Sequence, residues 1–277
     1  MTKQSNTDTD RPAEEDAGRA SRGIQSVEVG GQLLKALART GRRMALKDLA
    51  READMSPAKA HPYLVSFGKL GLVEQDPVSG HYGLGQLAVQ LGLISLQQVD
   101  PVRLAIAELP ALAQRVGCTA SIAVWGAAGP VIVRVEEGPY AVNVVMRHGM
   151  PASLRRTGTG KVFAAFMDRT QIAPALAAEG LPEAMDDPVF AAELADIRRL
   201  GLSRVQDELL PGISAMAVPV FDGFGRLALA IAVIGPSVRL DMQPQGDQAQ
   251  TLISLGAALS QRLGARPIAV EATSAAS

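Results

Sequence analysis

This 277-residue sequence has only one cysteine, no long apolar run and no excess of charge of one sign. Its single cysteine, Cys118, cannot form an internal disulfide, a four-cysteine zinc site or a paired-cysteine redox centre, which is typical of a reducing compartment such as the cytoplasm. No segment approaches the roughly 18 consecutive apolar residues of a membrane span. The most apolar run, Leu227 to Ile234, is closed by Gly235 and Pro236, so we expect a buried strand there and no membrane partner.

The charges nearly cancel, with 27 Lys and Arg against 28 Asp and Glu, which excludes a uniformly basic protein that coats nucleic acid. Any surface that binds nucleic acid must therefore be confined to one part of the chain. Between Lys35 and Lys59, seven basic residues face three acidic ones. On charge alone this stretch fits either a contact with a polyanion or an ordinary solvated surface.

The length predicts about two domains, at roughly 150 residues each. A composition of 47% hydrophobic and 20% charged residues is that of globular protein. Residues 1–22 and 265–277 are expected to be flexible tails, and residues 1–22 lack the apolar centre of a secretory signal.

Residues 23–84 show three helical segments followed by a hairpin. The first helix ends near Gly41, and the second spans Leu46 to Ala53. The third starts with Ser56 as N-cap and Pro57 as first helical residue, and Gly71 stops it. Two short strands, 72–75 and 81–84, flank a turn rich in Pro and Gly. Three helices and a hairpin predict a winged helix-turn-helix.

Helical periodicity assigns faces to the first and third helices. The residues of the first helix expected in the core are Val27, Leu34, Leu37 and Ala38. Those of the third are Ala60, Tyr63, Leu64, Phe67 and Leu70. The outward face of the third helix is expected to consist of Ala58, Lys59, His61, Pro62, Val65, Ser66 and Lys69.

Residues 85–99 are expected to form a linker helix. Its apolar stripe is Leu87, Leu91, Ile94 and Leu96. A symmetric partner chain could cover this stripe, or it could pack on its own domain, and the sequence favours neither.

From Gly117 onward, short apolar runs with a period near two alternate with helical segments, and they predict a domain over residues 100–264. The expected strands are 119–125, 131–136, 141–147, 202–205, 214–222 and 226–234. The expected helices are 161–167, 171–179, 188–200 and 248–263, after one that Asp100 and Pro101 begin. Short connections such as 126–130 favour antiparallel pairing, so the fold class is α+β with a mainly antiparallel sheet.

Several motifs, in this order and spacing, resemble the IclR family of bacterial transcription regulators. They are the segments 23–28, 55–70, 71–76, 79–85, 157–161 and 217–222, and the resemblance covers about residues 24 to 264. It implies a winged helix-turn-helix that binds double-stranded operator DNA as a homodimer or dimer of dimers. It also implies a GAF-like α/β domain that binds a small effector.

The outward face of the third helix is expected to enter the major groove, which admits a helix and distinguishes all four base pairs. The expected DNA-binding residues are Ser56, Ala58, Lys59, His61, Ser66, Lys69 and His81. Two features depart from the family pattern. Pro62 stands where an arginine is common, and the wing has His81 and Gly83 where basic residues are frequent.

The segment 157–161 is not a phosphate-binding P-loop, because Arg155 and Val162 stand where that motif needs Gly and Ser or Thr. A glycine-rich beginning of a helix nevertheless favours an anion, although a tight turn would look the same. The resemblance assigns effector binding to Gly158, Thr159, Gly160, Ala215, Ala232 and Ile234. An apolar lining beside one anion-accepting segment predicts that the effector is a small carboxylic acid. Asp207 and Glu208 either contact this ligand or only cap a turn.

The expected function is a ligand-responsive repressor of a catabolic operon, with no metal and no cofactor. Two alternatives remain. Pro62 keeps open a protein-interaction adaptor whose helix-turn-helix no longer binds DNA. A GAF-like enzyme is the other, with Cys118 and His148 as the residues whose mutation would reveal catalysis.

Overall fold

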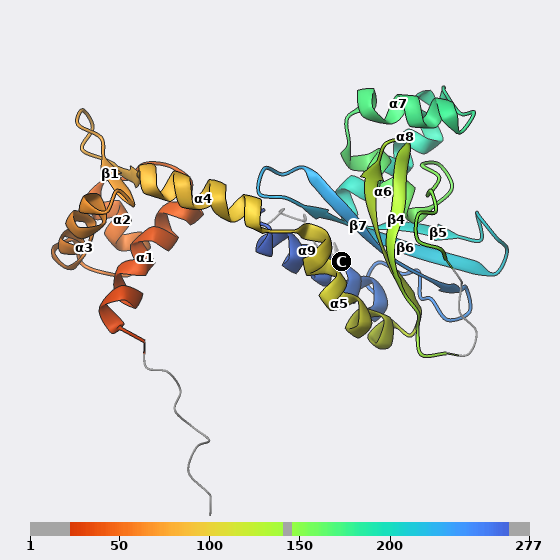
Figure 1. The fold of residues 1–277 in the computed structure, drawn as a ribbon, viewed down its shortest axis with the longest axis horizontal. Coiled ribbons are helices and arrows are strands. Elements are labelled where there is room, and N and C mark those ends of the chain that lie inside the picture. The colour runs from red at the N-terminus through yellow and green to blue at the C-terminus, as the bar shows by residue number, and fades with distance from the viewer. Residues whose placement is uncertain (1–22, 141–145, 266–277) are drawn as a thin grey trace, which may run out of the picture. The chain divides into compact units, whose positions relative to one another are not determined.

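A computed structural model describes residues 23–140 and 146–265 of the chain. The chain divides into two compact units, Met1–Ser95 and Leu96–Ser277 (Figure 1). The tails expected at residues 1–22 and from 266 onward, and most of the strand expected at 141–147, lie outside the described residues. The domain boundaries drawn from the sequence stay a prediction.

The first unit has the winged helix-turn-helix arrangement that the sequence predicts. Its elements are α1 (Gln25–Thr40), α2 (Leu46–Glu52), α3 (Pro57–Lys69), β1 (Val73–Gln75), β2 (Tyr82–Leu84) and α4 (Gln86–Gln98). β1 and β2 pair antiparallel. Met44 also bridges to Tyr82, which attaches the hairpin to the segment between α1 and α2. None of the described helices is long and apolar enough to cross a membrane.

The core face of α1 differs from the predicted one. Leu33, Ala36 and Leu37 are buried, whereas Val27 and Ala38 are exposed. The reason is Gly30, which has no side chain and lies against the rings of Tyr63 and Phe67, so this close approach sets the rotation of the helix. Apolar periodicity does not show such an approach, because the decisive residue has no side chain.

The core face of α3 was predicted correctly except at its end. Ala60 and Leu64 are buried, and Tyr63 and Phe67 are half-buried. Leu70 was expected in the core but is exposed, because α3 ends at Lys69 and Leu70 is its C-cap.

The second unit is a five-stranded antiparallel sheet with helices on both faces, which confirms the α+β class. Its elements are α5 (Pro101–Val116), β3 (Thr119–Gly126), β4 (Gly129–Glu136), α6 (Gly158–Phe166), α7 (Arg169–Ala178), η1 (Ala184–Asp186), α8 (Pro188–Leu200), β5 (Ser203–Gln206), β6 (Ile213–Phe221), β7 (Leu227–Pro236) and α9 (Asp247–Arg262). The strand order is β4-β3-β7-β6-β5.

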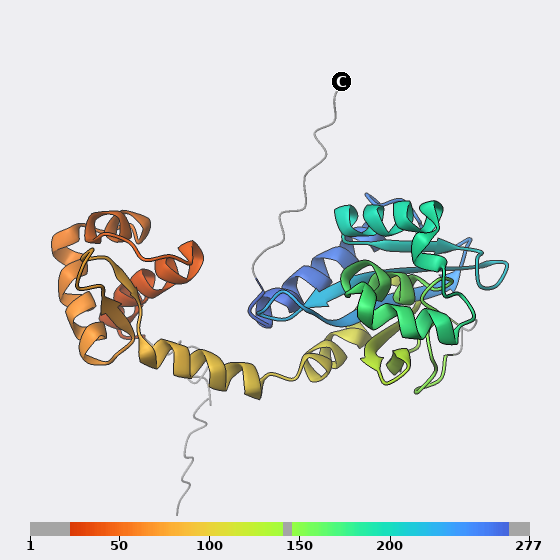
Figure 2. The ribbon, with the colours of Figure 1, turned by 90° about the horizontal axis from the view of Figure 1, so that it is seen from above.

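The two faces of this sheet carry different side chains. Branched residues such as Ile122, Val218 and Ile231 pack against α5 and α9. The opposite face carries small residues, among them Ala217 and Ala232, and α6, α7 and α8 cover it (Figures 1 and 2). Small side chains let a helix lie close to the strands, and this is the face on which the sequence predicts the effector site.

Gly85 tests the close packing of the first unit. A Cβ at this position would overlap the carbonyl oxygen of Gly71 and lie 3.1 Å from the carbonyl carbon of Val73. We expect Gly85→Ala to lower the free energy of unfolding of the first unit by about 1–3 kcal/mol, the usual cost of overpacking. Circular dichroism during a urea titration would measure this loss of stability. The urea transition followed by the fluorescence of Trp125 should not change, because Trp125 lies in the second unit.

Gly31→Ala is the matched control. Gly31 lies inside α1, and a Cβ there would meet no described atom within 4 Å. This substitution should raise the free energy of unfolding by about 0.5–1 kcal/mol through helix propensity. Equal effects of the two substitutions would contradict the close approach at Gly85.

Candidate functional site

The start of α3 is fixed by the capping residues that the sequence indicates. The Ser56 hydroxyl accepts a hydrogen bond from the amide of Lys59 at 3.3 Å, and Pro57 occupies the first helical position. Capping satisfies an amide that has no partner within the helix. Ser56 therefore has a structural role in addition to any contact with DNA.

All seven residues expected on the outward face of α3 are exposed: Ala58, Lys59, His61, Pro62, Val65, Ser66 and Lys69. Pro62 cannot donate to the Ala58 carbonyl, yet α3 continues to Lys69. The hydroxyl of Ser66 donates to the carbonyl of Pro62 at 3.0 Å, so that proton is used inside the helix. The exposed face of α3 therefore presents apolar groups and cations more than free hydroxyl donors.

Carboxylate side chains stabilise the wing, which is the hairpin formed by β1 and β2. Asp76 accepts hydrogen bonds from the amide and hydroxyl of Ser79 and from the amide of Val78, and these bonds, with the Ser79 amide first, lower the pKa of its carboxyl group. Arg43 lies across Gly83 and pairs with Glu74 and with Asp76.

This arrangement bears on DNA contact by the wing. The guanidinium of Arg43 is already paired with two carboxylates at the base of the wing, which disfavours a phosphate contact there. His81 is half-buried beside the turn, where its backbone bonds to Asp76 and Ser79.

In the second unit, the glycine-rich segment is the first turn of α6 and not a loop before it. The sequence predicts a helix from Lys161, but α6 begins at Gly158 with Thr157 as N-cap. The Thr157 hydroxyl accepts from the Gly160 amide at 2.9 Å. Gly158 and Thr159 supply the first two amides of the helix, at the positive end of its dipole.

The two glycines in this turn face different neighbours. A Cβ on Gly158 would lie 3.7 Å from Ala217 Cβ, Ala215 O and Ser203 Oγ, so this residue faces the sheet. A Cβ on Gly160 would overlap the carbonyl oxygen of Ser153. Gly160 is therefore a packing position, and its amide is already bonded to the cap.

The apolar residues expected in the effector site lie on the sheet face that α6 covers. Ala215 is paired with Ile234, and Ala217 with Ala232, across β6 and β7. Ser203, on β5, is opposite Ala217 and shares this face. Among the described residues, the buried hydroxyl of Ser203 makes no hydrogen bond. The structure thus brings Gly158, Ala215, Ala232 and Ile234 to one face, together with a hydroxyl that the sequence analysis did not single out.

Asp207 and Glu208 have separate roles in the structure. Asp207 has a positive φ of 57° and accepts hydrogen bonds from the amide of Gly212 at 2.7 Å and the hydroxyl of Ser237 at 2.7 Å. Of the two interpretations left open for Asp207, this geometry is that of a turn cap. Glu208 instead pairs with Lys161, with oxygens 2.8 and 3.0 Å from Nζ.

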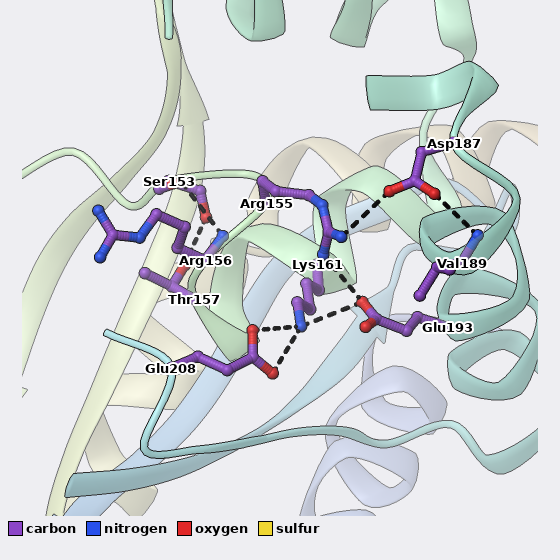
Figure 3. A network of polar contacts seen from close by, with 9 residues as sticks. All are labelled: Ser153, Arg155, Arg156, Thr157, Lys161, Asp187, Val189, Glu193 and Glu208. Carbon is purple, nitrogen blue, oxygen red and sulfur yellow. Dashed lines mark hydrogen bonds and ion pairs between the residues drawn. The ribbon is translucent and has the colours of Figure 1, made fainter. Parts of the chain in front are cut away.

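The sequence analysis missed the ion-pair network around Lys161 (Figure 3). Lys161 is only 2% exposed, and its Nζ also lies 3.1 Å from Glu193. Arg155 pairs with Glu193 at 3.3 Å and with Asp187 at 3.2 Å. A lysine in an otherwise apolar helix was the available signal, because a buried amine requires an acidic partner.

Cys118 and His148, the two residues named for the enzyme alternative, lie in different surroundings. Cys118 is buried, and this burial raises the pKa of its thiol, which disfavours the nucleophilic thiolate. His148 is exposed in the segment before α6. Within the described ranges no three His, Cys, Asp or Glu residues are grouped so that they could hold a metal ion.

Comparison with known proteins gives matches over both units. Residues 26–77 match the IclR helix-turn-helix domain, and residues 94–261 match the C-terminal domain of the bacterial transcriptional regulator IclR. The glycerol operon regulatory protein of Streptomyces griseus is 30% identical over 250 residues, which cover 88% of this chain and 98% of that protein.

Two further relatives extend this likeness. The transcriptional repressor IclR of Escherichia coli K12 is 26% identical over 224 residues, 78% of this chain and 82% of that protein. The crystal structure of Pseudomonas aeruginosa HmgR matches with a TM-score of 0.82 and 36% identity, over 88% of this chain and 100% of that one. The chain belongs to the IclR family of transcriptional regulators.

Proposed function

We propose that this protein represses a catabolic operon in the cytoplasm, and that a small carboxylic acid bound to its second unit changes its affinity for the operator. The exposed face of α3 carries the DNA-binding half of this proposal, because Lys59, His61 and Lys69 lie there and Pro57–Lys69 contains no acidic residue. The remaining expected contacts are Ser56, Ala58, Ser66 and His81. The names of two relatives, a repressor and an operon regulatory protein, support this role.

The proposed effector site lies where α6 begins against the sheet. The amides of Gly158 and Thr159 favour an anion at the helix N-terminus. Ala215, Ala232 and Ile234 supply an apolar surface on the same sheet face, and Ser203 adds a hydroxyl. An anion beside an apolar surface describes a carboxylic acid with an aliphatic or aromatic body.

Lys161 does not serve as the cation for this acid. Its Nζ already contacts carboxylates of Glu208 and Glu193, and the side chain is almost fully buried. Helix amides and the hydroxyl of Ser203 therefore supply the hydrogen bonds to the ligand. Glu208 and Gly160 act indirectly, by holding the start of α6, and Asp207 holds the neighbouring turn.

The dimeric state is also proposed, from α4. Four of its apolar side chains, Val89, Leu91, Leu93 and Ile94, are 50–57% exposed, and α4 contains no charged residue. At about 100° per residue they point in several directions around the helix. A helix that is apolar on all sides is normally buried, so we propose that a second copy of the chain covers α4.

For Lys59, we expect that Lys59→Ala weakens operator binding and lowers the slope of log affinity against log salt by about one, because one phosphate contact is lost. Gel-shift titrations at several salt concentrations would measure both, with an operator selected from genomic fragments. Lys35→Ala, on the exposed side of α1, is the control and should keep the wild-type slope.

An unchanged slope in Lys59→Ala would reject that phosphate contact. If the wild-type protein enriched no genomic sequence at all, the adaptor alternative would be favoured instead.

For the effector, we expect calorimetry to show binding of aliphatic or aromatic acids but not of their methyl esters. Gly158→Ala should reduce this affinity about tenfold or more, since its methyl group would occupy space that the ligand needs beside the helix amides, and a steric conflict of this kind costs about 1–3 kcal/mol. The variant should fold, because the added Cβ has only ordinary contacts at 3.7 Å.

Gly31→Ala, in α1 of the first unit, is the control for effector binding, since a Cβ there meets no described atom within 4 Å. It should leave the affinity unchanged. Binding of only sugars or cations would contradict the proposed ligand class.

For the dimer, we expect Leu91→Gln combined with Ile94→Gln to shift the protein toward monomers in sedimentation velocity experiments. Val78→Gln is the control, because Val78 is 95% exposed at the tip of the wing. A wild-type protein that is monomeric at micromolar concentration would contradict the proposal, as would a double variant that sediments like the wild type.

A further inference from the structure

The central line of the exposed face of α3 is apolar. Ala58, Pro62 and Val65 follow one another at steps of four and three residues, which places them within about 60° around the helix. All three are exposed, and Val65 is 44% exposed. The buried residues Ala60 and Leu64 lie on the opposite side.

Most cations and hydrogen-bonding groups of this face lie beside the apolar line. Lys59 and Ser66 are on one side of it and His61 is on the other, about 60–100° away around the helix. Lys69 continues the line at the end of α3. This surface is chemically complementary to a partner whose apolar groups lie between rows of negative charge.

The major groove of DNA has this chemistry where it contains thymine. Among the four bases, only thymine carries an apolar group, its C5 methyl, on the major-groove edge. Ala58, Pro62 and Val65 have no side-chain donor or acceptor, so they cannot read G·C pairs through hydrogen bonds.

We propose that Ala58, Pro62 and Val65 read the C5 methyl groups of thymines, so that the operator half-site has T·A pairs under this line. The inference rests on the proposed DNA-binding function of α3. Pro62 suits this role because its pyrrolidine ring is rigid and apolar, and it is exposed on this face. Lys59 and Lys69 then contribute affinity through phosphates, while the apolar line contributes discrimination.

Deoxyuridine provides a direct test, because it keeps the base pair of thymine and lacks only the methyl group. In an operator selected from genomic fragments, each thymine of a half-site is replaced in turn, and gel-shift affinities of the full-length protein are compared. Replacement under the apolar line should weaken binding about fourfold for each buried methyl group. Replacement elsewhere should change affinity by less than twofold.

Val65→Ala identifies the side chain responsible. It should weaken binding to the thymine operator and remove the deoxyuridine penalty at one position, as a double-mutant cycle would show. Val65 is exposed, so this variant should fold, and its thermal unfolding would verify that. Val27→Ala, at a site 67% exposed on α1, is the control and should retain every penalty.

Two outcomes would overturn the inference, and they are distinguishable. If the operator is bound specifically but no deoxyuridine substitution changes affinity twofold, thymine readout is wrong while the DNA-binding function stands. If no duplex is bound in preference to others, both proposals fail, and the apolar line is better explained as a contact for another protein.

Discussion

The start of α6 depends on a close approach of two backbone segments, which only glycine at position 160 allows. A Cβ there would overlap the Ser153 carbonyl oxygen and lie 2.7 Å from the Cα of Leu154. Neither segment can easily yield, because Glu179 holds the Ser153 hydroxyl at 2.6 Å and the Leu154 amide at 2.8 Å. The position of the Gly158 amide is thereby set by backbone packing rather than by a mobile side chain.

The ion pairs around Lys161 add a second constraint on the same turn. Three carboxylates, those of Asp187, Glu193 and Glu208, face the cations of Arg155 and Lys161, and Asp187 also caps α8 through the amide of Val189. Lys161 is the buried member of this network, so loss of its carboxylate partners would leave an uncompensated charge inside the protein. The network therefore fixes where α6, α8 and the segment after β5 meet.

Local signals in the sequence predicted more of this structure than distant contacts did. Ser56 and Asp100 were identified as caps because capping involves amides two or three residues away. The start of α6 was misplaced because glycine disfavours helix, and only packing against Ser153 overrides that preference. The partners of Lys161 were missed because Glu208 is 47 residues away along the chain.

Both candidate sites use few free polar side chains. In α3 the hydroxyls of Ser56 and Ser66 bond to their own helix, and in the second unit Lys161 is neutralised by acids. At these two candidate sites, binding of DNA or of an effector would then depend mainly on backbone amides, exposed cations and apolar surface. Cations act on phosphates of any sequence, so in the proposed complex with DNA affinity and discrimination would come from different residues of α3. A substitution on one side of this helix can change one property without the other, because Lys59 and Val65 lie on separate lines around it.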